Sequence, residues 1–142
     1  MAPEVFSDAW ARAWGEEMSG SVAYRQAAAK WEGVVVLVME PDPELGVAAE
    51  RAVFADLWHG ECRSAGQAAP EQRAQAPIVI AAAARTWRDV LADRTDPVFG
   101  LMSGALRLER GSLMALFPFT SAAKEMVAAA RRVEVSLPTG WR

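Results

Sequence analysis

The spacing of apolar residues predicts two helices at the start of the chain. Apolar residues recur every four positions across residues 6–18, which places them on one helical face. Ser7 or Asp8 stands where a helix needs a side-chain cap for its first backbone N–H groups. A Ser-Gly-Ser break follows, and a second helix is expected to end at Gly33. The predicted buried residues of this second helix are Tyr24, Ala27, Ala28 and Trp31.

Two strands of different character are predicted next. Residues 34–39 form an uninterrupted, mostly β-branched apolar run, which is typical of a central strand covered on both faces. Residues 51–58 instead alternate, with Asp56 on the same side as Phe54 and Trp58. Because an unpaired buried carboxylate is unfavourable, we expect that side to be partly wet or to hold a partner for Asp56.

A hairpin and an edge strand are expected to follow. His59-Gly60 suits a two-residue turn, and residues 61–68 have the low β propensity of a strand at the edge of a sheet. Residues 69–76 are rich in Pro, Gln, Glu and Arg, which predicts a solvated loop.

In the second half of the chain, the spacing of apolar residues changes several times between that of a strand and that of a helix. Residues 77–80 suit a short buried strand, and Thr86–Asp89 fits a capping box at a helix start. Asp96-Pro97 suits the start of another helix, which Gly104 is expected to end. Residues 105–110 alternate apolar and charged positions, as in a strand with one wet face. After a turn, a dense apolar cluster is formed by Leu113, Met114, Leu116 and Phe117.

A last helix is predicted to begin at Thr120–Ser121. Arg131-Arg132 lies in its final turn, where positive charge suits the helix dipole. Residues 137–142 are expected to form a loose tail, in which Trp141 has no assigned role. The predicted apolar stripe of the last helix contains Phe119, Ala123, Met126, Val127, Ala130 and Val133.

The order of these elements indicates a fold class. Helices come first, then a meander of strands, then helices interrupted by one strand. This order predicts an α+β fold, in which helices cover a mostly antiparallel sheet. The length of 142 residues, without a repeat or a linker, favours a single domain over residues 1–142.

One long segment carries most of this order: "PIVIAAAARTWRDVLADRTDPVFGLMSGALRLERGSLMALF". Two shorter segments, "SVAYRQAAAKWEG" and "VFADLWHGE", add to it, so the pattern spans roughly residues 6–133. The whole pattern resembles the sterol carrier protein type 2 family, also called the sterol-binding or lipid-transfer domain. Arg110-Gly111 departs from it, since many family members have Gly-Asp or Gly-Asn at this turn.

This resemblance implies a five-stranded sheet with an apolar tunnel between the sheet and the C-terminal helices. It also implies an intracellular carrier that shields a fatty acid, a fatty acyl thioester or a sterol-like ligand, without a catalytic signature. A mobile C-terminal helix bearing Phe119 and Met126 would then be the lid of the tunnel. Candidate partners for a ligand head group at the mouth are Arg107, Arg110, Arg131 and Arg132.

Flexible and aromatic side chains of the second half are the predicted tunnel residues. Periodicity alone favours a filled core at these positions, whereas the family resemblance favours a ligand tunnel. Methionine suits a tunnel because its unbranched side chain adapts to guests of several shapes. The predicted ligand-binding residues are Trp87, Phe99, Met102, Leu106, Met114, Phe117, Phe119 and Met126.

Composition narrows the choice of partners. Hydrophobic residues make up 52% of the chain, and this surplus indicates an internal cavity or a subunit interface. A net charge of −3 disfavours nucleic acid, which needs a basic face. The single Cys62 allows no internal disulfide, and the apolar run at residues 34–39 is too short to cross a bilayer. We therefore expect a cytoplasmic protein without a transmembrane segment or targeting signal, whose membrane contact is at most transient.

The residues that catalysis or metal binding would need are sparse. His59 and Cys62 lie three positions apart, but a turn between strands seldom provides the electropositive pocket that activates a thiol. A lone histidine is an equally weak basis for a metal site. Asp42 and Glu44 suit a solvated loop. We predict no enzymatic activity, no cofactor and no metal.

Two alternatives to a lipid carrier are open. A chain with the same fold and a closed core would be an interaction module, whose surplus apolar surface forms a homodimer or contacts a partner. An enzyme acting on an acyl-CoA-like substrate is less favoured, because a nucleophile with a nearby base is missing.

Overall fold

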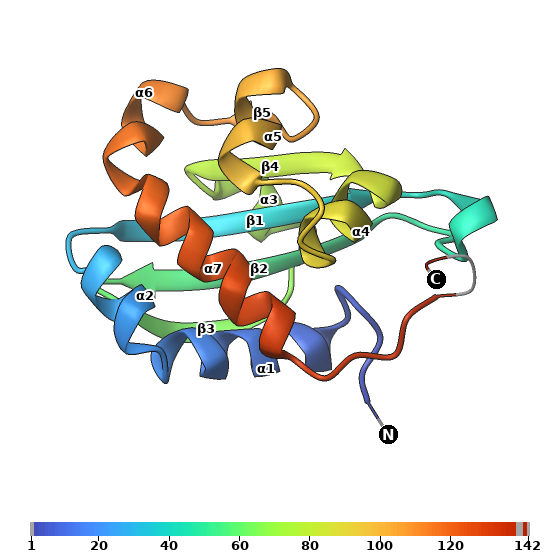
Figure 1. Cartoon of the computed structure of the whole chain (residues 1–142), viewed down its shortest axis with the longest axis horizontal. Coiled ribbons are helices and arrows are strands. Elements are labelled where there is room, and N and C mark those ends of the chain that lie inside the picture. Colours follow the sequence, from blue (N-terminus) through green and yellow to red (C-terminus); the bar gives the residue numbers. More distant parts are fainter. Residues whose placement is uncertain (1, 139–140, 142) are drawn as a thin grey trace.

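The computed structural model describes residues 2–138 and 141, and it contains a five-stranded sheet (Figure 1). The strands are β1 (Glu32–Glu40), β2 (Arg51–Trp58), β3 (Glu61–Gln67), β4 (Ile78–Ala83) and β5 (Arg107–Arg110). Their order is β3-β2-β1-β4-β5, and neighbouring strands are antiparallel except for β1 and β4, which are parallel. The predicted α+β fold with a mostly antiparallel sheet is confirmed, with one parallel pair.

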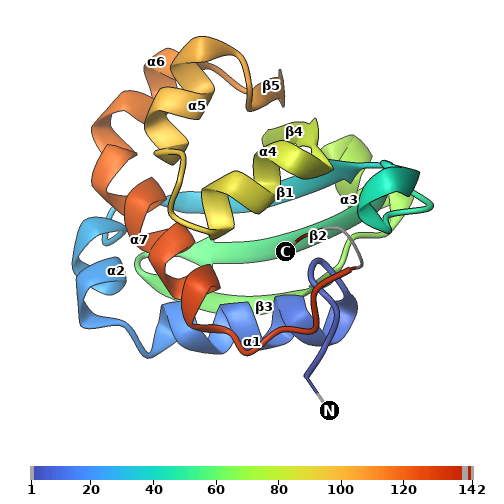
Figure 2. The same cartoon turned by 45° about the vertical axis from the view of Figure 1, so that its right-hand side comes forward.

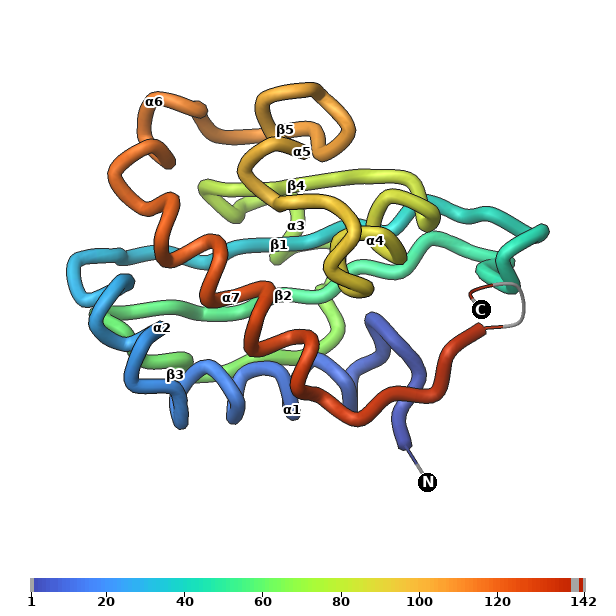
Figure 3. The backbone as a smooth tube through the Cα atoms, viewed as in Figure 1, coloured from blue at the N-terminus to red at the C-terminus, as the bar shows by residue number. Residues whose placement is uncertain are grey.

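Most of the helices cover one face of this sheet. The helices are α1 (Asp8–Ser19), α2 (Val22–Ala27), α3 (Pro70–Gln75), α4 (Ala84–Leu91), α5 (Pro97–Ser103), α6 (Leu113–Leu116) and α7 (Thr120–Arg132), with 3-10 turns η1 (Pro43–Leu45) and η2 (Phe117–Phe119). In Figures 1, 2 and 3, α7 runs diagonally across the covered face, α1 lies beside β3, and α3 lies on the opposite face. Within the described residues, no helix has the length and apolar character needed to cross a membrane.

Strand β1 lies at the centre of the sheet and is covered on both faces. Val35 and Leu37 belong to the main core beneath the helices, whereas Val36 and Val38 belong to a smaller core on the other face. That smaller core also contains Ala76, at the end of α3. All of these residues are buried, so the prediction of a central strand is confirmed.

The edge strand β3 is shielded by α1. The Ser19 hydroxyl accepts the Cys62 backbone N–H at 3.1 Å, and the Asp8 carboxylate accepts the Gln67 backbone N–H at 2.8 Å. Gly15 allows the helix to come this close, because an added Cβ would lie 3.0 Å from the Cys62 sulfur. Helix α1 thus satisfies edge groups that would otherwise be open to another strand.

The turn between β2 and β3 has the predicted hairpin form. His59 and Gly60 have φ values of 50° and 84°, as a tight turn matched to strand twist requires. Gly60 also lies against the second helix, where an added Cβ would stand 2.5 Å from the Arg25 carbonyl oxygen. On the outer side of β2, Asp56 has the expected partner, since Arg63 lies 3.0 Å away.

The predicted caps of two helices are confirmed. The Ser7 hydroxyl accepts the Trp10 backbone N–H at 3.2 Å and begins α1. The Asp96 carboxylate accepts the Val98 backbone N–H at 2.7 Å and begins α5. Gly104 ends α5 in the left-handed conformation, with φ of 85°.

Two predicted helix boundaries are wrong. Helix α2 already ends at Ala27, and Gly33, which was predicted to end it, lies inside β1. Helix α4 begins at Ala84, so Thr86–Asp89 lies inside the helix and forms no capping box. Strand β4 stays paired with β1 up to Ala83, and the chain turns directly into the helix there. Strand pairing therefore outweighed the local capping signal.

A loop was predicted for residues 69–76, but most of this stretch, Pro70–Gln75, forms helix α3. Pro70 occupies the first position of α3, where a missing N–H has no cost. The Gln72 side chain accepts the Ala69 backbone N–H at 2.7 Å, which is the contribution of the third helical residue to a capping box. Strand β5 also begins later than predicted, at Arg107 instead of Ala105.

The C-terminal tail is partly held against the core. The Ser136 backbone N–H donates to the Pro3 carbonyl at 2.7 Å. Trp141, which had no assigned role, is only 5% exposed and belongs to the main core. Residues 139, 140 and 142 of the predicted tail lie outside the described residues.

Replacing Gly15 should test the close contact of α1 with β3. We expect Gly15→Val to lower the free energy of unfolding by about 1–3 kcal/mol, because its side chain has no room against Cys62 and Ala65. Glu16→Val, one position further on the exposed side of the helix, should change it by about 0.5 kcal/mol or less. Urea denaturation followed by circular dichroism would measure both. Equal effects of the two substitutions would contradict this account of α1.

Candidate functional site

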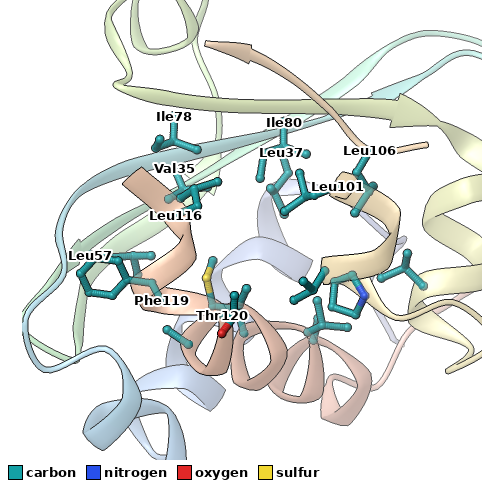
Figure 4. A pocket seen from close by; sticks show the side chains of 18 of the residues that line it. Val35, Leu37, Leu57, Ile78, Ile80, Leu101, Leu106, Leu116, Phe119 and Thr120 are labelled. Carbon is teal, nitrogen blue, oxygen red and sulfur yellow. The ribbon is translucent and has the colours of Figure 1, made fainter. Parts of the chain in front are cut away.

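An apolar cavity of about 110 Å3 lies between the sheet and helices α4, α5, α6 and α7. Its floor is made by alternate residues of three strands, which Figure 4 shows pointing into the cavity. They are Val35 and Leu37 of β1, Leu57 of β2, and Ile78 and Ile80 of β4. The parallel register pairs Val35 with Ile78 and Leu37 with Ile80, so all four side chains lie on one face.

Helices and their connections form the roof. The Asp96 cap fixes the start of α5, which carries Leu101 over the floor (Figure 4). On α7, three of the lining residues are alanines, namely Ala122, Ala123 and Ala130. Their short side chains do not fill the space opposite the strands, in contrast to a normally packed core.

Aromatic rings pack at one end of the cavity. The ring centroids of Phe6 and Trp10 are 5.0 Å apart, and those of Trp10 and Trp14 are 5.6 Å apart. Phe6 also contacts Trp87 of α4, with ring centroids 5.2 Å apart. Phe6 and the first two tryptophans are at most 2% exposed, so this end is closed to solvent.

The cavity has almost no polar surface. Among the described residues that line it, none is charged. The indole N–H groups of Trp14, Trp31 and Trp87 donate to backbone carbonyl oxygens at 2.9–3.1 Å, so none of them needs a partner inside the cavity. Hydroxyl groups come from Thr120 and Tyr24. Burial raises the pKa of Tyr24, which keeps its phenol neutral.

The mouth of the cavity lies between α5 and α6. Met102, Leu113 and Phe117 line the cavity and are also 65%, 38% and 48% exposed. They lie on α5, α6 and η2, which neighbour one another at the top of Figures 1 and 2. An apolar guest can therefore reach the cavity at this side without passing a charged lining residue.

Comparison with known proteins shows that this fold is a known one. A crystal structure of sterol carrier protein 2 is 45% identical to this chain, covers 92% of it and 99% of its own length, and has a TM-score of 0.83. The chain belongs to the sterol carrier protein 2 family. A solution structure from Thermus thermophilus, of a conserved hypothetical protein called possibly a sterol carrier protein, is 43% identical. It covers 96% of this chain and 94% of its own, with a TM-score of 0.83.

More remote members share the fold alone. Sterol carrier protein 2 from Yarrowia lipolytica, in its apo form, is 14% identical, covers 90% of both chains and has a TM-score of 0.57. No family model and no curated protein matches the sequence. The resemblance seen in the sequence is thus confirmed through solved structures.

Six of the eight predicted ligand-binding residues line the cavity of this sterol carrier protein 2 domain. Phe99 and Met114 do not line it; they are 66% and 77% exposed on α5 and α6. The contact of any of the eight with a ligand stays a prediction. The six that line the cavity are Trp87, Met102, Leu106, Phe117, Phe119 and Met126.

Sequence reasoning missed two parts of the lining. The strand floor was hidden because the apolar run of β1 is continuous and does not show which residues face the helices. The register of β1 with β4 would have shown it, but this parallel pairing was not predicted. The N-terminal aromatic stripe was recognised as a helix face, although its spacing alone could not distinguish a cavity wall from a filled core.

The four arginines predicted at the mouth all have partners within the protein. Three of them pair with carboxylates, whereas Arg110 keeps its net charge and donates to backbone carbonyl oxygens. Their partners are Glu40 for Arg107, the carbonyl oxygens of Arg73 and Ala76 for Arg110, the Val90 carbonyl oxygen and Asp93 for Arg131, and Glu17 for Arg132.

Helix α7 is anchored and does not resemble a mobile lid. Arg131 donates two hydrogen bonds to the Val90 carbonyl oxygen, at 2.7 and 3.2 Å, which join α7 to α4. Arg132 lies 3.2 Å from Glu17 of α1. The Met126 carbonyl oxygen accepts an indole N–H at 3.0 Å, also from α1. We therefore expect α5 and α6, at the mouth, to move instead of α7 when a guest passes.

His59 and Cys62 form no catalytic pair. The His59 imidazole lies 2.7 Å from Glu32, whereas the Cys62 sulfur donates to the Ser64 carbonyl at 3.3 Å. Burial and the nearby Asp56 carboxylate raise the pKa of the Cys62 thiol to about 11, so it is protonated at neutral pH. The described part of the chain contains no group of three or more His, Cys, Asp or Glu side chains placed to hold a metal.

A second depression, of about 430 Å3, lies on the opposite face of the sheet beside α3. Unlike the cavity, it is lined partly by charged residues. Arg73 pairs there with Glu50 and Glu109, and Arg110 donates to backbone carbonyl oxygens. These charges satisfy one another and tie α3 to the sheet, so we assign no ligand to this depression.

Alkylation should reveal the protonated state of Cys62. We expect native protein at pH 7.5 to react with iodoacetamide on the order of 10²-fold more slowly than protein unfolded in guanidinium, because little thiolate is present at a pKa of about 11. Mass spectrometry of quenched time points would give both rates. A native rate that matches the unfolded rate would show that the thiol is exposed and ionised.

Proposed function

We propose that this member of the sterol carrier protein 2 family is a non-enzymatic lipid carrier. Its cavity shields the acyl chain of a fatty acid or fatty acyl thioester, with residues 1–142 acting as one domain. The observation that carries this proposal is the uncharged, apolar cavity with a mouth between α5 and α6. Family membership supports it, since solved relatives are named sterol carrier proteins. A cytoplasmic location stays a prediction.

Burial of an acyl chain would supply the affinity, at about 25 cal/mol for each Å2 of apolar surface removed from water. The cavity of about 110 Å3 is similar in scale to an engineered cavity of about 150 Å3 that takes up benzene. A longer chain therefore requires side chains of the mouth and the roof to move. Met102 and Met126 suit this, because an unbranched thioether changes conformation at low energy.

The geometry favours a flexible chain over a rigid sterol. A flexible chain can follow the space between the strand floor and the alanines of α7, whereas a fused-ring ligand would require the anchored helices to separate. The head group is expected to remain in water at the mouth, since the arginines predicted to hold it are engaged elsewhere. A sterol-like ligand is the less favoured member of the class.

One observation favours the alternative of a homodimeric interaction module. Several large apolar side chains near the mouth are exposed, as they would be in a subunit taken from a dimer. Such a module would leave the cavity without a lipid. Oligomeric state and lipid content therefore distinguish the two functions.

Native mass spectrometry of the purified protein is the most direct test. We expect a monomer that carries about one lipid per chain, or that takes up one fatty acid on incubation, because a cavity of about 110 Å3 has no room for a second acyl chain. Solvent extraction followed by mass spectrometry would identify the lipid. A dimer that stays free of lipid after incubation with fatty acids and acyl thioesters would exclude the carrier function.

Filling part of the cavity should weaken binding without unfolding the protein. We expect Ala123→Leu to weaken hexadecanoic acid binding by about tenfold or more, equivalent to about 1.4 kcal/mol, because the new side chain occupies space that the guest needs. Ala52→Leu, the same change on the opposite face of the sheet, should have little effect. Isothermal titration calorimetry would measure both affinities. Equal affinities for the two variants would place the ligand outside the cavity.

A further inference from the structure

Five exposed apolar side chains stand on the three elements that form the mouth of the cavity. They are carried by α5, α6 and η2, and their exposed fractions run from 38% to 77%. We call the surface that they form the apolar rim. It consists of Phe99, Met102, Leu113, Met114 and Phe117.

The apolar rim lies in two stretches of sequence without charge. Residues 97–106 and 111–123 contain no Asp, Glu, Lys, Arg or His, although Asp, Glu, Lys and Arg make up 23% of the whole chain. A soluble protein normally places charged side chains on such exposed helices, so their absence here indicates a surface that meets an apolar phase.

Charges next to the apolar rim balance in number, so they leave no excess of one sign. Arg110 donates only to backbone carbonyl oxygens, but Arg73 beside it meets two carboxylates, those of Glu50 and Glu109. Between the two uncharged stretches, Arg107 pairs with Glu40, and Glu109 lies 3.2 Å from Arg73. Near the start of α7, Lys124 lies 3.8 Å from Asp96. A surface of this kind does not match a partner of strong opposite charge, such as an anionic membrane or a basic protein. It matches the zwitterionic surface of a neutral phospholipid bilayer.

The apolar rim is continuous with the cavity. Met102, Leu113 and Phe117 belong to both, whereas Phe99 and Met114 extend the same surface outward. A second copy bound to the rim would cover the mouth and block a guest. A bilayer in the same place would supply the guest, because an acyl chain could pass from the hydrocarbon phase into the cavity without crossing water.

We propose that the apolar rim inserts into a zwitterionic phospholipid bilayer and holds the mouth of the cavity against it during lipid exchange. This inference extends the proposed carrier function. The side chains of the apolar rim enter the interfacial layer, where phenylalanine and methionine are favourable, while the exposed charged side chains of β5 stay in water. Attachment is reversible, because α5 and α6 are short and neither can span the bilayer.

Vesicle sedimentation with delipidated protein tests the inference. We expect wild-type protein to sediment with phosphatidylcholine vesicles, and the double variant Phe99→Ser with Met114→Ser to bind about tenfold more weakly or worse, because two exposed anchors are lost. Neither residue lines the cavity, so affinity for hexadecanoic acid in vesicle-free buffer should be unchanged. High salt should not weaken vesicle binding, because no net charge draws the rim to the surface.

Val22→Ser is the matched control. Val22 is 69% exposed on α2, which lies apart from α5 in Figures 1 and 2. This variant should sediment like the wild type. Circular dichroism and thermal unfolding of all variants would show whether the fold is kept. We expect that it is, because all three substituted positions are exposed.

Several results would overturn the inference. One is equal vesicle binding by the wild type and the double variant. Another is wild-type binding that requires anionic lipid and disappears in salt. A wild-type dimer that the double variant dissociates would make the rim a contact between copies of this chain. Failure of the carrier function is a separate outcome, in which vesicles bind through the rim but hexadecanoic acid does not bind in vesicle-free buffer.

Discussion

The parallel pairing of β1 with β4 is the constraint on which the rest of the structure depends. Strands β1, β2 and β3 follow one another as a meander, and the chain then returns through α3 to place β4 on the free side of β1. This arrangement brings two strands rich in Val and Ile side by side, with their cavity-facing residues in register. It also leads the chain straight from β4 into α4, and so sets where the remaining helices begin.

The unfilled space beneath α7 lowers the stability of the folded protein. Measured cavities destabilise proteins by about 24 cal/mol for each Å3, so an empty volume of about 110 Å3 corresponds to about 2–3 kcal/mol. Hydrogen bonds that join α7 to α4 and α1 hold the roof in place despite this loss. A guest that fills the space would recover part of that energy, so occupancy and stability are linked in this fold.

Local signals predicted the elements better than they predicted the cavity. Ser7, Asp96 and Gly104 mark helix ends through chemistry that acts over a few residues, and the structure has these ends where expected. The capping signal at Thr86 failed because β4 and α4 are continuous, which is a property of the sheet and not of that segment. Gln72 capped a helix in a stretch whose composition suggested a loop.

The candidate site shows the same limit of local sequence signals. Apolar residues of the second half were correctly grouped near the cavity, but the short helices α5 and α6 are apolar on more than one side, so their pattern could not show that Phe99 and Met114 face outward.

The distribution of tryptophan has a consequence for how this protein can be observed. Trp10, Trp14, Trp31 and Trp87 all line the cavity, and indole emission responds to the polarity of its surroundings. Trp58 lies on the other side of β2, is 40% exposed and stacks against His59. The chain thus contains a group of indoles around the cavity and a separate one at the surface. The intrinsic tryptophan fluorescence of the protein is therefore expected to change when the cavity is filled.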